Sequence, residues 1–166
     1  MMDGFAWSSK AGIAVVLFLV AGGVHLLIGA LTPFVLRMMK PDSTLILSER
    51  SDSATYDRST GEWMSAEPAL RTYRNVVFHI VAGLLVAAGI MEILLAWFGV
   101  RAGMTWALAA LTFVGGATIL FWLVALMPYF EAGAPVGLGD LPPFIWIPSV
   151  AYPPAILLAW WARVSG

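Results

Sequence analysis

The sequence predicts an all-α integral membrane protein, a bundle of four transmembrane helices. Of its 166 residues, 60% are apolar and 11% are charged, whereas ordinary soluble domains hold about 45–50% apolar and about 25% charged residues. A soluble fold of this size would have to expose large apolar patches. Four apolar runs reach the roughly 20 residues that one crossing of the hydrocarbon core requires. Residues 1–166 are therefore expected to form a single transmembrane domain.

Composition also excludes several classes of site. Cysteine is absent, which excludes disulfides, thiolate nucleophiles and cysteine-ligated metals in this chain. The formal net charge is −1, and no basic face is present that would neutralise the phosphates of a nucleic acid. The usage of alanine, glycine and tryptophan is typical of a bacterial inner membrane protein, which is the localisation that we expect.

The first span is predicted at residues 12–36, an uncharged run that ends at Arg37. Its length argues against a removed signal peptide. A polar loop follows at residues 37–67, and parts of it have strand-like composition, which predicts a small β-hairpin over one mouth of the bundle. An irregular loop is an equal alternative. The strand-like segments are Thr44–Leu47, Ala54–Asp57 and Glu62–Met64, with a turn at residues 57–61.

The second span is predicted at residues 68–98. Pro68 suits the first turn of a helix, and Ser65 is expected to cap that turn. The connection that follows, residues 100–103, is so short that the second and third spans should be antiparallel neighbours.

The third span is predicted at residues 104–127 and should stop at Pro128. The fourth span, residues 144–162, contains three prolines that each remove a backbone donor. A kinked crossing is favoured, and a broken or re-entrant segment shielded by protein or water is the alternative. The prolines of the fourth span are Pro148, Pro153 and Pro154.

Aromatic residues support four crossings because they fall into two belts, as tryptophan and tyrosine do at membrane interfaces. Both orientations stay open: the lysine and arginine count favours a cytoplasmic first loop, but the two faces are similar per exposed residue. The belts are Trp7, Trp97, Trp106, Trp160 and Trp161 on one face, and Tyr73, Tyr129 and Trp146 on the other.

Glu92 is the strongest candidate for a functional residue. An ionisable side chain within a span is costly and marks a functional site by default. Ala88, Gly89 and Ala96 share its helical face, and such small residues allow helices to approach closely. Glu92 should therefore face protein. The favoured interpretation is structural: a hydrogen bond across helices, or a reach toward the lipid headgroups at the Arg101 end. The alternative is a proton-binding or ligand-anchoring carboxyl.

His25 lies on a similar line of small residues in the first span. At about 1.5 Å per residue it is about 18 Å from the first-loop face, and Glu92 is about 25 Å from the same face. A hydrogen bond between His25 and Glu92 is therefore predicted if the first two spans are neighbours.

His79 is a weaker candidate for ligand or proton binding, because it lies only about 6 Å inside the first-loop face. It would then bond to loop backbone as an interfacial histidine. Its depth differs from that of His25 by about 12 Å, so the two cannot ligate one haem. A third convincing metal ligand is lacking. We expect no metal and no cofactor.

Three functions follow from these residues. The favoured one is a non-catalytic subunit or small scaffold that packs against other membrane proteins, or against copies of itself, through small-residue faces. The alternative is binding or transport of a small apolar ligand, a lipid or quinone, in an intramembrane pocket near Glu92 and His25. An acid–base enzyme is third, because no nucleophile or charge clamp accompanies the pair. The small-residue faces are Gly22-Gly23, Ala87-Ala88-Gly89 and Gly115-Gly116.

Overall fold

The computed structural model describes residues 6–38 and 44–165. The chain is all-α, with four long apolar helices packed as a bundle. All four are long and apolar enough to cross a bilayer, so the predicted class is confirmed and the chain is a multi-pass membrane protein. The long helices are α1 (Lys10–Met38), α4 (Pro68–Leu94), α5 (Thr105–Glu131) and α6 (Pro143–Val164), and α4 continues into a π-helix, η1 (Leu95–Val100).

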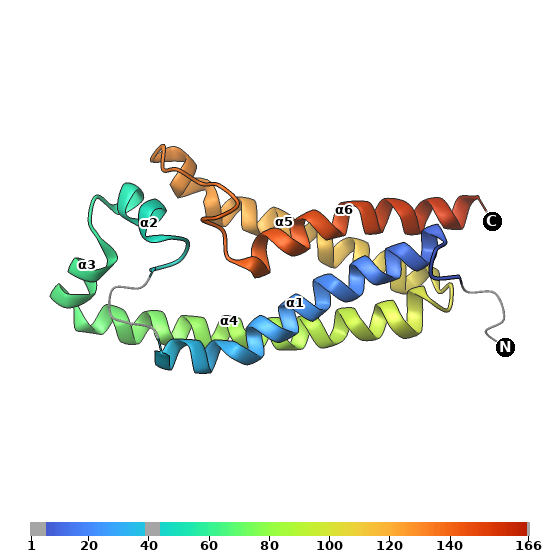
Figure 1. Ribbon diagram of the computed structural model, residues 1–166, viewed down its shortest axis with the longest axis horizontal. Helices are drawn as coiled ribbons and strands as arrows, with labels where there is room; N and C mark the ends of the chain where they lie inside the picture. The colour runs from blue at the N-terminus through green and yellow to red at the C-terminus, as the bar shows by residue number, and fades with distance from the viewer. Residues whose placement is uncertain (1–5, 39–43, 166) are drawn as a thin grey trace.

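Helix α1 is the centre of the bundle. It packs along α4 on one side and along α6 on the other, while α5 packs against α6 and against η1. Both termini lie at one end of the molecule (Figure 1). The predicted tight connection is present: Gly103 has φ +74 and its N–H donates to the carbonyl of Val100 (2.9 Å). Beyond this connection α4 and α5 diverge toward the opposite end (Figure 1).

The predicted β-hairpin is wrong, since the loop folds into two short helices, α2 (Glu49–Tyr56) and α3 (Thr60–Ala66). The described residues contain no strand. Residues 39–43 of the predicted loop lie outside the described part of the chain.

Local capping explains this helical outcome. The Ser48 hydroxyl accepts the N–H of Ser51 at the start of α2. At the start of α3, Ser59 and Glu62 form a capping box in which each side chain accepts the other's backbone N–H. Asp57 takes the left-handed conformation between the helices, with φ 54. Each cap satisfies one otherwise unpaired backbone N–H in the first turn of its helix, which favours helix over the weak strand propensity of the segments.

Prolines interrupt the long helices less than expected. Helix α5 runs past Pro128 to Glu131, and the N–H of Ala132 closes its last turn on the carbonyl of Pro128 (3.0 Å). Helix α6 is continuous across its three prolines, so it is not broken, and it is long and apolar enough to cross a bilayer. Tyr152 and Ala155, beside the proline pair, are buried against neighbouring helices, whereas Pro153 and Pro154 are exposed. At the start of α4, Pro68 is the first residue as predicted, but Ser65 lies within α3 and does not cap it.

Glycines allow α1 and α4 to approach within backbone contact. A Cβ on Gly89 would lie 2.5 Å from the backbone N of Leu26 and 2.6 Å from the carbonyl O of Gly22. A Cβ on Gly29 would lie 2.6 Å from the carbonyl O of Ala82. Such distances exclude any larger side chain, so van der Waals packing of backbone on backbone holds the two helices together.

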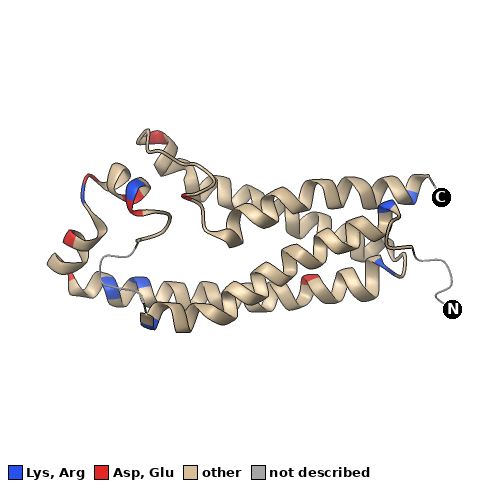
Figure 2. Cartoon of the chain, viewed as in Figure 1, with Lys and Arg blue, Asp and Glu red and all other residues tan. Residues whose placement is uncertain are grey.

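The end of the bundle near the termini carries stacked cations and tryptophans. Lys10 Nζ lies 3.6 Å from the ring centre of Trp161, and the Arg101 guanidinium lies 4.5 Å from that of Trp97. Lysines and arginines lie at both ends of the long helices (Figure 2). An amphipathic ring with a cation above it suits the headgroup depth, which agrees with the predicted belt.

Gly89→Ala is expected to destabilise the protein by roughly 1–3 kcal/mol, because the added methyl group overlaps the backbone of α1. Gly83→Ala, in the same helix, is the matched control, because no atom lies within 4 Å of the position that its Cβ would occupy. It should be neutral or stabilising by up to about 1 kcal/mol. Thermal unfolding in detergent, followed by circular dichroism, measures both. Equal melting temperatures for the two variants would contradict the close contact.

Candidate functional site

His25 and Glu92 meet in the core, as their predicted depths allowed. His25 Nδ1 lies 2.9 Å from Glu92 Oε2 and 3.2 Å from Oε1. Both side chains are buried, with 2% of each residue exposed. The pair joins α1 to α4 at hydrogen-bond distance.

Close packing of small residues makes this contact geometrically feasible. A Cβ on Gly22 would lie 3.0 Å from the Cβ of Glu92, so a larger residue at position 22 would push the carboxyl away. Gly89, one turn before Glu92, lies against the backbone of α1. The face that the sequence marks as small is therefore the face that holds the carboxyl.

Tyr152 of α6 joins the pair, and sequence analysis missed it. Its ring fits against Gly115, where a Cβ would lie 2.5 Å from the ring carbon Cδ1, and lies edge-on to Phe18 at 5.9 Å. Its buried hydroxyl faces Glu92 and makes no hydrogen bond to the described residues. The available signal was a tyrosine in the middle of a span, away from both aromatic belts. We call His25, Glu92 and Tyr152 the polar cluster.

His79 lies apart from the polar cluster. It is exposed on the surface of α4, and its Nδ1 lies 2.6 Å from the carbonyl O of Asn75 in the same helix. The prediction that His79 bonds to loop backbone is therefore wrong, because its backbone partner lies in its own helix. In the described part of the chain, no three His, Asp or Glu side chains gather closely enough to hold a metal ion.

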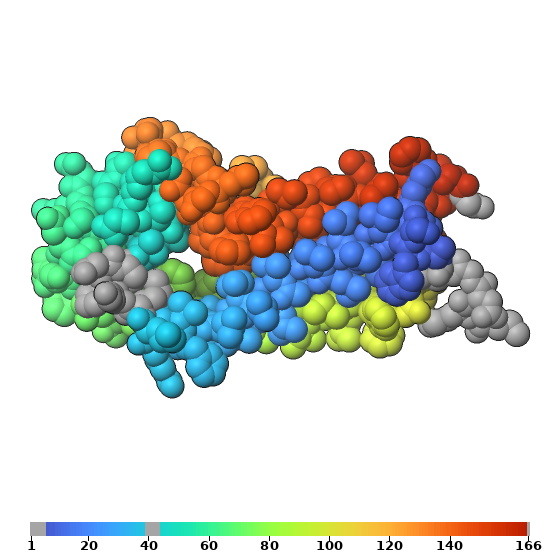
Figure 3. Space-filling model, viewed as in Figure 1, coloured from blue at the N-terminus to red at the C-terminus, as the bar shows by residue number. Residues whose placement is uncertain are grey.

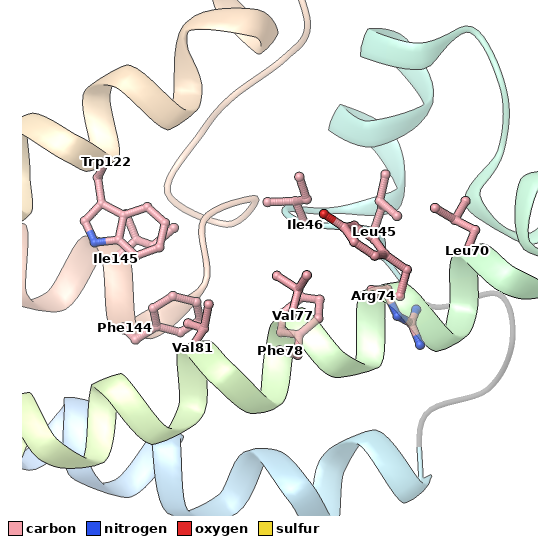
Figure 4. A pocket seen from close by; sticks show the side chains of 11 residues that line it. Leu45, Ile46, Leu70, Arg74, Val77, Phe78, Val81, Trp122, Phe144 and Ile145 are labelled. Carbon is pink, nitrogen blue, oxygen red and sulfur yellow. The ribbon is translucent and has the colours of Figure 1, made fainter.

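An apolar cavity of about 290 Å³ opens where α4 diverges from α5 and α6. Every protein atom exposed to it is apolar. Figure 4 shows side chains from four separate segments pointing into this space. Its inner end is reached at Val81, about 16 Å along α4 from Glu92 at about 1.5 Å per residue. The lining residues are Leu45, Ile46, Leu70, Tyr73, Arg74, Val77, Phe78, Val81, Trp122, Phe144 and Ile145.

Neither Glu92 nor His25 lines this cavity, so the pocket expected near these two residues stays a prediction. Sequence analysis could not find the cavity, since its walls are ordinary apolar residues from distant parts of the chain. No periodicity or motif distinguishes them from lipid-facing residues.

Residues 44–66, which we call the cap, lie at the end of the molecule opposite to the termini (Figure 1) and contribute Leu45 and Ile46 to the cavity wall. Asp52 organises the cap. Its Oδ2 accepts the N–H groups of Leu45 (2.6 Å) and Ile46 (3.1 Å), and its Oδ1 accepts the hydroxyl of Tyr129 from α5 (2.8 Å). In Figure 3 the cap meets the α5–α6 connection, and α4 is visible in the hollow between them and α1.

A second set of bonds fastens the cap to the α5–α6 connection. Asp140 accepts the Ser48 hydroxyl (2.7 Å), the Arg50 guanidinium (2.6 Å) and the N–H of Gly137 (2.9 Å). These donors, with Ser48 first, stabilise the carboxylate and lower the pKa of Asp140 to about 2. The hydroxyl of Ser51 adds a bond to the carbonyl of Pro135 (2.6 Å).

Arg74 ties α4 to the cap from beneath. It is buried, with 5% of the residue exposed, and donates to the carbonyl of Thr44 (3.3 Å) and to Asn75 Oδ1 (3.2 Å). Figure 4 shows its guanidinium turned away from the cavity, so only its aliphatic stem lines the wall.

No known protein family, curated protein or solved structure matches the chain. The functional conclusions therefore depend on the geometry of the cavity and of the polar cluster.

The amide proton of Gly137 should report the titration of Asp140, because it donates to that carboxylate. Since the pKa is depressed, the stabilisation of the cap is complete above the ordinary value of 3.8 and is lost as the pH falls through about 2. We expect the NMR shift of this amide to titrate with a midpoint of about 2. In Asp140→Asn the shift should not titrate. A midpoint near 3.8 in the unmodified protein would show that the cap is not fastened by this carboxylate.

Proposed function

We propose that the protein binds a hydrocarbon chain of a membrane lipid in the apolar cavity. The observation that carries this proposal is a cavity within a membrane-spanning bundle whose exposed atoms are all apolar. Apolar cavities of this kind do not take up water and do take up hydrocarbons. The volume of about 290 Å³ is at the small end of ligand sites, which suits part of one chain.

The lining favours a hydrocarbon chain over the ring of a quinone. The carbonyl oxygens of a quinone would need hydrogen-bond donors, because a polar group buried without a partner is costly. Tyr73, Arg74 and Trp122 line the wall and carry donors. None of their polar atoms is exposed to the cavity, and the Arg74 guanidinium is bonded to Thr44 and Asn75. An acyl or prenyl chain needs no such partner.

The packing of the glycines weakens the case for a scaffold subunit. Gly22, Gly89 and Gly115 are occupied within the bundle, where a Cβ on each would contact α4, α1 and Tyr152 respectively. Gly23 and Gly116 have no atom within 4 Å of a built Cβ. The face available to a partner chain is thus smaller than the sequence indicated, and the cavity supports lipid binding more directly.

Val81→Trp is expected to fill the inner end of the cavity and to weaken lipid retention at least about tenfold. Displacing two methylene groups, at about 0.8 kcal/mol each, accounts for this factor. Leu84→Trp is the matched control, because Leu84 is on the same helix, is 66% exposed and does not line the cavity. Native mass spectrometry of protein released gently from its membrane measures bound lipid per chain.

Two results of that measurement would refute the proposal. Equal lipid retention in Val81→Trp and Leu84→Trp, with both variants folded, would show that the cavity is not the binding site. A stoichiometric partner protein that is retained while no lipid is bound would favour the scaffold function instead.

A further inference from the structure

The polar cluster is isolated in the membrane-spanning part of the bundle. Glu92 lies near the end of α4 that continues into η1, whereas in Figure 2 lysines and arginines lie at the helix ends and in the cap. Within the described part of the chain, the titratable groups that face one another there are His25 from α1, Glu92 from α4 and Tyr152 from α6. Helix α5 contributes Gly115, which packs against the tyrosine ring.

The cluster has more hydrogen-bonding capacity than the surrounding protein uses. His25 Nε2 and the Tyr152 hydroxyl are both buried without a hydrogen-bond partner among the described residues. Leaving such an atom unpaired costs about 1–3 kcal/mol, and native proteins retain few of them. A packing contact between α1 and α4 would require only His25 Nδ1 and the Glu92 carboxyl. It does not explain why His25 Nε2 and the Tyr152 hydroxyl are buried without a partner among the described residues.

Counting protons supplies that explanation. With one proton shared between His25 and Glu92, the pair is neutral overall, either as imidazolium and carboxylate or as imidazole and carboxylic acid. Without that proton the pair carries a net charge of −1, and an uncompensated charge inside a membrane is expensive. The Tyr152 hydroxyl is a donor beside the carboxylate. It can turn to the carboxylate when the proton leaves, and the bond would then offset part of that charge.

We infer that His25, Glu92 and Tyr152 form a binding site for one exchangeable proton inside the bundle. The proton resides on His25 or on Glu92, and Tyr152 is a positioning residue that stabilises the carboxylate in its absence. This site is separate from the apolar cavity, so the inference does not depend on lipid binding.

Two spectroscopic readouts together detect this proton wherever it resides. Infrared difference spectra record the C=O stretch of a protonated carboxyl group, and ¹⁵N NMR of labelled histidine distinguishes imidazolium from imidazole. The chain has two histidines, so His79→Gln leaves His25 as the one NMR signal and also serves as the control outside the cluster. His79 is exposed, so its replacement should not disturb the fold.

We expect the polar cluster to release one proton per chain as the pH is raised from about 4 to about 10, in the protein in lipid nanodiscs, in addition to the protons that groups outside the cluster release. When this proton is released in His79→Gln, either the infrared carboxyl band of Glu92 or the ¹⁵N NMR signal of His25 should change. In Glu92→Gln the release should fall by one proton per chain, because an amide keeps a hydrogen bond but has no titrating proton. In Tyr152→Phe the carboxyl band of Glu92 should shift in frequency, because the carboxyl group loses the hydroxyl beside it.

The inference fails if neither signal changes over this range in His79→Gln, a result that does not require Glu92→Gln to fold. It also fails if Glu92→Gln is folded and releases as many protons as the unmodified protein. A purely structural pair would give that second result.

Discussion

Helices α1 and α4 pack closely at Gly22, Gly29 and Gly89. An added Cβ at Gly29 or Gly89 would overlap the backbone of the other helix, and one at Gly22 would be in tight contact with it. Lipid offers no hydrophobic driving force between helices, so close van der Waals contact of this kind must supply the attraction. The same contact brings Glu92 to His25 across a distance that larger residues would widen. It also leaves the opposite face of α1 for α6, which contributes Tyr152. The polar cluster is thus a consequence of where these glycines lie.

The cavity forms where helices α4 and α5 separate, whereas the polar cluster forms where helices α1 and α4 pack closely. Helix α4 meets α5 through η1 beside the short connection, and the two diverge toward the other end of the molecule. The cap is fastened there by Asp52 and Asp140, whose carboxylates accept bonds from backbone, Tyr129, Ser48 and Arg50. Polar bonds hold the cap at the membrane surface, while an apolar space remains beneath it. Such an arrangement suits a molecule with a polar end and an apolar chain.

Two physical environments are therefore separated along α4. Around Val81 the space is empty and apolar, and around Glu92 the protein is fully packed and polar groups meet. The proposed binding of a lipid chain involves only the first environment, and the proposed exchange of a proton involves only the second. One helix supports both because its two halves face different neighbours.

The four spans could be predicted from the sequence, because a crossing requires only a run of about 20 apolar residues, which is a local property of the chain. The sequence also predicted that His25 and Glu92 could meet, since depth along a helix follows from residue number. The two helices of the cap were within its reach as well: Ser59 and Glu62 form a capping box readable from their spacing, and strand propensity was given too much weight. Only the tertiary structure decided that Tyr152 completes the cluster and that Ile46, Val77, Trp122 and Ile145 enclose a cavity. These groups come from segments far apart in the chain, and the angle at which helices diverge is set by packing between helices, which no local pattern records.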